Sequence, residues 1–145
     1  MVAFYSALSG ESGVANDVPA LQLNTATVDA ALAAMQLQPQ GYYVVAPGAE
    51  YGPAKRWPAR HFAVLAEQLR LPVVLLGSSK ESALCAEIAR TLNSAQPGQC
   101  LDWSGRTSLD HALAAIAAAK ALVSNDSGLM HVAAAFGLPQ VALFG

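Results

Sequence analysis

Residues 124–131 of the chain read Ser-Asn-Asp-Ser-Gly-Leu-Met-His, and they separate two apolar runs. The run before them, 121–123, is Ala-Leu-Val, and the run after them, 132–136, is rich in alanine. This pattern predicts a strand, a tight turn and a helix. Asp126 or Ser127 is a suitable N-cap, because either side chain can accept hydrogen bonds from the first helical turn. Gly128 lets the backbone come close to whatever sits there.

The start of this predicted helix is a candidate anion site. Its free N–H groups and the positive end of the helix dipole suit an anion such as a phosphate. The other interpretation is a capped helix start with nothing bound. These residues alone do not decide between the two.

The composition indicates a globular chain of low charge. Of its 145 residues, 54% are hydrophobic and 12% are charged, which supports a core and argues against disorder. The net charge of -2 gives no electrostatic reason to expect nucleic acid or an anionic membrane surface as a partner. Cys85 and Cys100 form no CxxC or zinc pattern, so we expect buried or idle thiols in a reducing compartment.

No targeting or membrane-spanning segment is expected from the sequence. The N-terminus lacks the basic region of a signal peptide. The most apolar stretch, 112–123, contains Lys120 and is too short to cross a bilayer. We therefore expect a soluble cytoplasmic protein without a transmembrane segment.

Strand and helix patterns alternate along the chain. The expected strands are residues 42–46, 72–76, 100–103, 121–124 and 141–144. The expected helices are 28–35 with Thr27 as cap, 59–70, 80–93, a helix capped by Ser108 that turns Leu109 and Leu113 inward, and 127–136. The alternation predicts an α/β fold: a Rossmann-like, doubly wound parallel sheet of about five strands with flanking helices.

The domain organisation follows from the same pattern. Residues 1–40 are interpreted as a lead-in or interdomain segment with a short helix, and residues 41–145 as the Rossmann-like domain. A doubly wound sheet normally continues past a fifth strand, so we expect the chain to be part of a larger protein. The sheet edge left exposed by such a truncation would allow a homodimer.

A ligand crevice is expected where the strand order reverses. In the order 3-2-1-4-5 the first and fourth strands are neighbours, and ligands bind beyond their carboxyl ends. The loop 47–58 would then face the turn 125–131. Lys55 and Arg56 of that loop, opposite a helix N-terminus, would form a two-sided clamp for phosphate oxygens. A solvated surface pair is the alternative.

Three other side chains have two interpretations each. Glu81 follows the second strand, where an acid often binds a ribose hydroxyl, but it also fits an exposed first-turn glutamate. His131 lies one turn after Ser127 and would either donate to a phosphate or pack structurally. Trp57 is more often a core residue than a stacking surface for a ligand.

Several nucleotide and catalytic motifs are missing from the sequence. There is no GxGxxG after the first strand, no P-loop and no GxSxG nucleophile elbow. There is also no Asp-x-Asp pair for a Mg²⁺–nucleotide. Neither a metal nor a cofactor is implied.

Two segments carry a family resemblance. PGAEYGPAKRWP at 47–58, together with SNDSGLMHVAAA at 124–135, resembles the heptosyltransferase family of GT-B glycosyltransferases. The resemblance runs from about residue 41 to residue 145. It implies an enzyme of two Rossmann-like domains with the active site between them. The chain resembles the carboxyl-terminal, nucleotide-sugar-binding domain, in truncated form.

The resemblance also implies a reaction. Heptose would pass from ADP-heptose to the inner-core heptose of lipopolysaccharide, with inversion at the anomeric carbon. The family's proposed base, an Asp, belongs to the amino-terminal domain, so no catalytic residue of this chain is certain, although Lys55 and Asp126 would assist. The expected location is cytoplasmic, or peripheral at the inner face of the bacterial inner membrane. The chain alone is expected to be inactive in transfer.

The same resemblance implies roles for individual residues. Lys55 would lie near the diphosphate and heptose, Glu81 near the ribose and Asp126 near the donor sugar. The backbone N–H groups of Ser127, Gly128 and Leu129 would face the diphosphate, with His131 nearby. Two alternatives remain: a non-catalytic nucleotide-binding or assembly module, and a GT-B enzyme that uses another nucleotide sugar.

Overall fold

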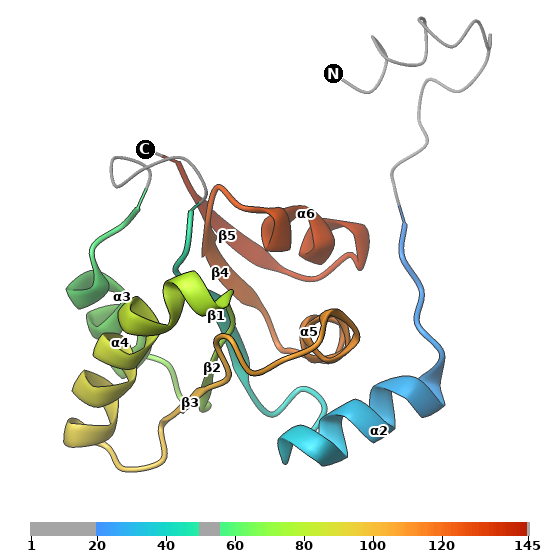
Figure 1. The fold of residues 1–145 in the computed structure, drawn as a ribbon, viewed down its shortest axis with the longest axis horizontal. Helices are drawn as coiled ribbons and strands as arrows, with labels where there is room; N and C mark the ends of the chain where they lie inside the picture. The colour runs from blue at the N-terminus through green and yellow to red at the C-terminus, as the bar shows by residue number, and fades with distance from the viewer. Residues whose placement is uncertain (1–19, 50–55, 145) are drawn as a thin grey trace, which may run out of the picture.

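The chain folds as a five-stranded parallel sheet with helices on both faces (Figure 1). The computed structural model describes residues 20–49 and 56–144. The elements in chain order are α2 (Thr25–Met35), β1 (Tyr43–Ala46), α3 (Ala59–Glu67), β2 (Val73–Leu75), the 3-10 helix η2 (Ser79–Glu81), α4 (Ser82–Ala95), β3 (Cys100–Asp102), α5 (Leu109–Ala117), β4 (Leu122–Asn125), α6 (Gly128–Ala135) and β5 (Gln140–Leu143). The strand order is β3-β2-β1-β4-β5, as predicted.

The central strand β1 shows why the sheet is covered on both faces. Val44 pairs with Val74 of β2 and with Leu122 of β4. Its side chain belongs to the core cluster shared with α2, α5 and α6, whereas Val45 belongs to the cluster shared with α3 and α4. Successive strand residues point to opposite faces, so a strand buried on both faces must be apolar throughout.

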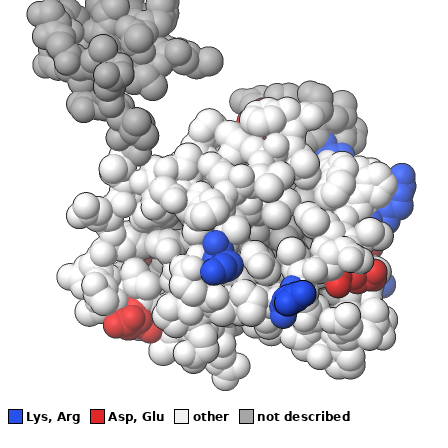
Figure 2. Space-filling model, turned by 180° about the vertical axis from the view of Figure 1, so that it is seen from behind, with Lys and Arg blue, Asp and Glu red and all other residues white. Residues whose placement is uncertain are grey.

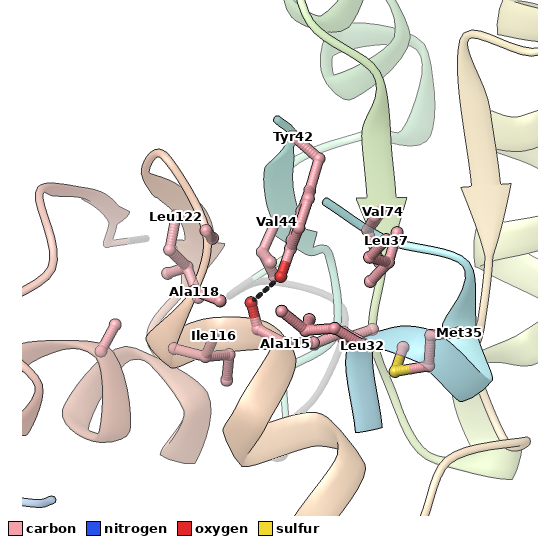
Figure 3. Packing of buried hydrophobic residues seen from close by; sticks show 13 residues of the cluster. Leu32, Met35, Leu37, Tyr42, Val44, Val74, Ala115, Ile116, Ala118 and Leu122 are labelled. Carbon is pink, nitrogen blue, oxygen red and sulfur yellow. Dashed lines mark hydrogen bonds between the residues drawn. The ribbon is translucent and has the colours of Figure 1, made fainter. Parts of the chain in front are cut away.

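Helix α2 packs on the core together with α5. Leu32 and Met35 are buried there, in the same core cluster as the strand residue Val44 (Figure 3). The Tyr42 hydroxyl donates a hydrogen bond of 2.7 Å to the carbonyl oxygen of Ala115. Burial raises the pKa of Tyr42 above its ordinary value. This hydrogen bond satisfies the one polar atom of an otherwise apolar side chain.

The second core cluster contains both cysteines. Cys85 and Cys100 are buried and free, as predicted, and burial raises the pKa of each thiol to about 12. The Asn93 side-chain amide joins α4 to the first residue of β3. Its Nδ2 donates to the Cys100 carbonyl at 2.9 Å, and its Oδ1 accepts from the Cys100 amide at 3.0 Å.

Three sequence expectations about the helices are corrected. Asn24, not Thr27, caps α2: its side chain accepts from the Ala26 amide at 2.8 Å, which starts the helix one turn earlier. The helix expected from residue 80 begins instead with the 3-10 turn η2. Leu109 is 70% exposed, because the buried residues of α5 are Ala114, Ala115 and Ile116, more than one turn further on.

The surface has few charges, and β5 is one of the two edge strands of the sheet. Figure 2 shows a face that is mostly neutral, with scattered basic and acidic side chains. β5 lies at the edge of the sheet, and Val141 and Phe144 at and beyond it are 55% and 70% exposed. Within residues 20–49 and 56–144, no helix has the length and apolar character needed to cross a membrane.

Candidate functional site

The carboxyl ends of β1 and β4, where a ligand crevice is expected, lie side by side in the sheet. Ala46 pairs with Ser124 in parallel register, so Pro47, which follows β1, lies beside Asn125, the last residue of β4. Figure 1 shows the two strands as neighbours near the middle of the sheet. The sequence therefore located correctly the place where the loop after β1 meets the turn before α6.

The start of α6 is not capped by the side chain at its N-cap position. Ser127 occupies that position in an extended conformation, with φ of -147° and ψ of 165°, and makes no side-chain cap hydrogen bond. Its Oγ is buried, with no partner among the described residues. Of the two cap candidates, Asp126 and Ser127, it is Ser127 that occupies the N-cap position, but its hydroxyl accepts no bond from the first turn. The backbone N–H groups of the first turn of α6 therefore donate no hydrogen bond to the Ser127 hydroxyl.

The remaining predicted residues of this turn differ in exposure. Gly128 and His131 are exposed, whereas Asp126 and Leu129 are half-buried. Leu129 packs against the core cluster beneath α6. The Asp126 amide donates to the Leu143 carbonyl of β5 at 3.0 Å, which fixes the turn to the neighbouring strand.

Glu81 also lies beyond the carboxyl ends of the strands, at the end of η2, which follows β2. One carboxylate oxygen, Oε2, accepts from the Ser78 amide at 2.6 Å and completes a capping box. The other, Oε1, fills the space beside Gly48: an added Cβ at Gly48 would lie 1.4 Å from it. Glu81 thus lies in a first turn, as the alternative interpretation has it, but it is half-buried rather than exposed. In addition, the carboxylate contacts the loop after β1.

The loop after β1 is fixed at both described ends. Asn125 is 1% exposed, and its Nδ2 donates to the Pro47 carbonyl at 2.6 Å. Its Oδ1 accepts from the Trp57 amide at 3.1 Å. The Arg56 guanidinium donates to the Ala49 carbonyl from Nε at 3.3 Å and from Nη2 at 3.0 Å. These bonds close the loop upon itself and attach it to the end of β4.

The proposed cationic clamp is described only in part. Lys55 lies outside the described residues, so its predicted position is not tested. Arg56 is exposed, and its guanidinium binds a carbonyl of its own loop. Trp57 packs against the core and makes edge-to-face contacts with His61 and Phe62, with ring centroids 5.2 and 5.1 Å apart. This agrees with the core interpretation of Trp57.

The sequence did not predict that the loop after β3 contacts the loop after β2, beyond the carboxyl ends of the strands. The Gly105 amide donates to the Gly77 carbonyl at 2.9 Å, so the loops after β2 and β3 lie against each other. Gly105 has φ of +66°, a conformation that favours glycine. The Arg106 guanidinium stacks over Trp103, 5.2 Å from the ring centroid. The only signal was the turn composition at 105–108.

The described residues contain no group of three or more His, Cys, Asp or Glu side chains that could hold a metal ion. The geometry offers the helix start of α6, the two hydrogen-bonded ends of the loop after β1, and one oriented carboxylate. Such a set suits a ligand with both an anionic part and hydroxyl groups.

Comparisons with known proteins identify relatives of one kind. The model of glycosyltransferase family 9 (heptosyltransferase) matches residues 2–145. Lipopolysaccharide heptosyltransferase 2 of Escherichia coli (strain K12) is 55% identical over 102 residues, which cover 68% of this chain and 29% of that protein. Lipooligosaccharide heptosyltransferase 2 of Haemophilus influenzae is 47% identical over 102 residues, covering 68% of this chain and 30% of that protein.

A solved structure shows the same similarity. The structure of E. coli ADP-heptose lps heptosyltransferase II superposes with a TM-score of 0.87 at 42% identity. The match covers 100% of this chain and 48% of the chain in that structure. The chain thus spans about 29% to 48% of the length of these relatives.

Proposed function

Because the chain belongs to glycosyltransferase family 9, the heptosyltransferases, we propose that it supplies the ADP-heptose-binding part of a larger enzyme. That enzyme would transfer heptose to the inner core of lipopolysaccharide, with inversion at the anomeric carbon. The relatives' names support the reaction, because they are lipopolysaccharide and lipooligosaccharide heptosyltransferases. The name of the structural relative, ADP-heptose lps heptosyltransferase II, supports the choice of donor. Since the chain spans less than half of each relative, the complete reaction is proposed for the whole enzyme.

The observation that carries this proposal is the start of α6 beside the loop after β1. Ser127 makes no cap bond, so its hydroxyl does not compete with a diphosphate for the backbone donors at the positive end of the helix dipole. Asn125 holds the ends of the facing loop next to this turn. We assign the diphosphate to this junction, with the N–H groups of residues 127–129 as donors, His131 nearby and Lys55 on the opposite side.

The orientation of Glu81 supports a ribose subsite. A carboxylate is an acceptor for hydroxyl donors, and it is useful only if it is held in place. The Ser78 amide and the space at Gly48 hold it at the carboxyl edge of the sheet. We assign the ribose hydroxyls to Glu81 and the heptose to the neighbourhood of Asp126.

The proposed chemistry is stabilisation of a leaving group. An acceptor hydroxyl attacks the anomeric carbon from the face opposite ADP, the bond from that carbon to the diphosphate oxygen breaks, and the electron pair leaves with ADP. Negative charge then grows on the diphosphate, where the helix N-terminus and Lys55 stabilise it. The base that removes the hydroxyl proton is expected to be an Asp of the amino-terminal domain, so this chain alone should bind without transferring heptose.

Organisation, partners and location are proposed on the same basis. Residues 1–40 are assigned as a lead-in segment and residues 41–145 as the nucleotide-sugar-binding domain. The acceptor is lipopolysaccharide inner core, so we expect the enzyme in the cytoplasm, at the inner face of the inner membrane. The exposed edge of β5 is a surface through which two copies can pair. A molar mass that stays monomeric in light scattering up to high concentration would exclude that pairing.

Calorimetric titration of the 145-residue chain with ADP, AMP and UDP tests the donor assignment. We expect ADP to bind about tenfold more tightly than AMP, because only ADP places a second phosphate at α6, and a tenfold ratio corresponds to about 1.4 kcal/mol. No heat with ADP from a folded sample would refute the proposal. Preference for UDP would favour a GT-B enzyme with another donor.

Saturation-transfer NMR with ADP-heptose addresses the non-catalytic alternative. A donor site should transfer saturation to the heptose protons as well as to the adenosine protons. Saturation confined to adenosine would favour a nucleotide-binding module without a sugar subsite.

A further inference from the structure

The Asn125 side chain connects two backbone groups at opposite ends of the loop after β1. It donates to the Pro47 carbonyl at 2.6 Å and accepts from the Trp57 amide at 3.1 Å. With 1% of its surface exposed, this side chain has no face for a ligand. Its contacts are with the loop, and its backbone leads directly into the turn before α6.

The chemistry of this position requires an amide. Pro47 presents a carbonyl that only accepts, and Trp57 presents an N–H that only donates. An asparagine side chain has both a donor and an acceptor, whereas an ionised aspartate has acceptors only. Replacement by aspartate would keep the bond from Trp57, remove the bond to Pro47, and place a buried charge against a carbonyl oxygen.

The two groups that Asn125 joins lead to both sides of the proposed site. Pro47 is followed by Gly48, where the Glu81 carboxylate lies, so one end of the loop leads to the proposed ribose subsite. Trp57 follows Arg56, which is bonded to Ala49, and Lys55 precedes Arg56 in the sequence. Asn125 is therefore hydrogen-bonded to both ends of the loop, next to the start of α6.

We propose that Asn125 is a positioning residue: its amide sets the loop after β1 against the start of α6, so that diphosphate affinity depends on a side chain that does not touch the ligand. This inference deepens the proposed function and rests on it for the identity of the ligand. The hydrogen-bonded connection itself stands independently of any ligand.

The chain contains a matched control in Asn93. Its side-chain amide likewise donates one hydrogen bond to a backbone carbonyl and accepts one from a backbone N–H, both of Cys100. Cys100 opens β3, at the opposite end of the strands from the site. Asn93→Asp and Asn125→Asp thus remove hydrogen bonds of the same kind, from a half-buried side chain remote from the proposed site and from a buried one beside it.

The binding experiment compares these two variants with the unmodified chain. We expect Asn125→Asp to weaken ADP binding about tenfold or more, because the displaced loop should lose at least one well-placed hydrogen bond to the charged ligand. Asn93→Asp should change ADP binding less than about twofold. The ratio of ADP to AMP affinity should also fall, because the loop acts on the diphosphate. A merely structural role would lower both affinities in parallel and leave that ratio unchanged, which would overturn the proposal.

Hydrogen exchange provides a readout that needs no ligand. In Asn125→Ala the Trp57 amide loses its acceptor and should exchange about tenfold faster or more, whereas in Asn93→Ala it should exchange as in the unmodified chain. An unchanged Trp57 rate would overturn the proposal even if the chain binds ADP. If the unmodified chain binds no ADP while Trp57 responds as expected, the connection is supported and the proposed function fails instead.

Discussion

Replacement of Gly48 by alanine should separate ligand binding from folding. An added Cβ would lie 1.4 Å from Glu81 Oε1 and 2.2 Å from its Cδ, so the carboxylate must move away. The atoms it meets are the far end of a flexible side chain, which can rotate. Gly48 is not among the described glycines with positive φ, so its backbone accepts alanine. The substitution therefore acts on Glu81 rather than on the strand.

Two opposing terms set the expected stability. Moving Glu81 breaks its hydrogen bond with the Ser78 amide, a capping interaction worth about 1 kcal/mol. Alanine reduces the conformational freedom of the unfolded chain, which returns about 0.4–1 kcal/mol. The net change in the free energy of unfolding should therefore be less than about 1 kcal/mol. ADP affinity should fall about tenfold to a hundredfold, the effect of losing a charge-assisted hydrogen bond of about 1.5–3 kcal/mol.

A double-mutant cycle checks the cause. ADP affinity is measured by calorimetry for Gly48→Ala, Glu81→Ala and the double variant, with urea unfolding as the folding control. If Gly48→Ala acts through the carboxylate, it should have little further effect once Glu81 is removed. Additive losses, or wild-type affinity in Gly48→Ala, would refute this reasoning.

Three further predictions address the clamp, the cap and the core. Lys55→Ala should weaken ADP binding about tenfold in calorimetry, whereas Lys120→Ala, an exposed lysine after α5, should not. Ser127→Ala should change the urea midpoint little, corresponding to less than about 0.5 kcal/mol, because its hydroxyl makes no cap bond. The free energy of unfolding should fall above pH 9, by about 1 kcal/mol per thiol between pH 9 and pH 10. The reason is that the thiols ionise at their ordinary pKa of 9.0 in the unfolded chain, whereas burial raises the pKa of Cys85 and Cys100 to about 12 in the folded chain. A urea midpoint that stays constant from pH 8 to pH 10.5 would contradict the last.

The sheet was predictable because its strands are buried on both faces. A run such as 42–46 is apolar at every position, and such runs separated by helices allow few topologies other than a parallel sheet with right-handed crossovers. The order of the strands is then enough to bring Pro47 beside Asn125. Charge patterns played no part, since the chain has few charges.

Helix ends were less predictable, because several residues compete for the same cap. Asn24, Thr25 and Thr27 all have side chains that can cap a helix, and packing of Leu32 and Met35 on α5 decides how far the helix extends. Leu109 fits the apolar period of α5, yet it lies before the part of the helix that reaches the core. Periodicity gives the direction of a residue on the helix but not the end of the packed surface.

The site was predictable as a place but not as a set of bonds. Topology brings the loop after β1 and the turn before α6 together, and this needs only the strand order. Whether Asn125 caps a helix or joins a loop depends on which backbone groups approach its amide, and its partner Pro47 lies 78 residues away. Likewise, a glycine in a Pro-Gly loop predicts a turn, whereas the reason for Gly48 is the Glu81 carboxylate beside it. Both side chains act between segments that are distant in sequence, so local patterns locate the junction of the two segments, and only the folded arrangement shows the contacts that join them.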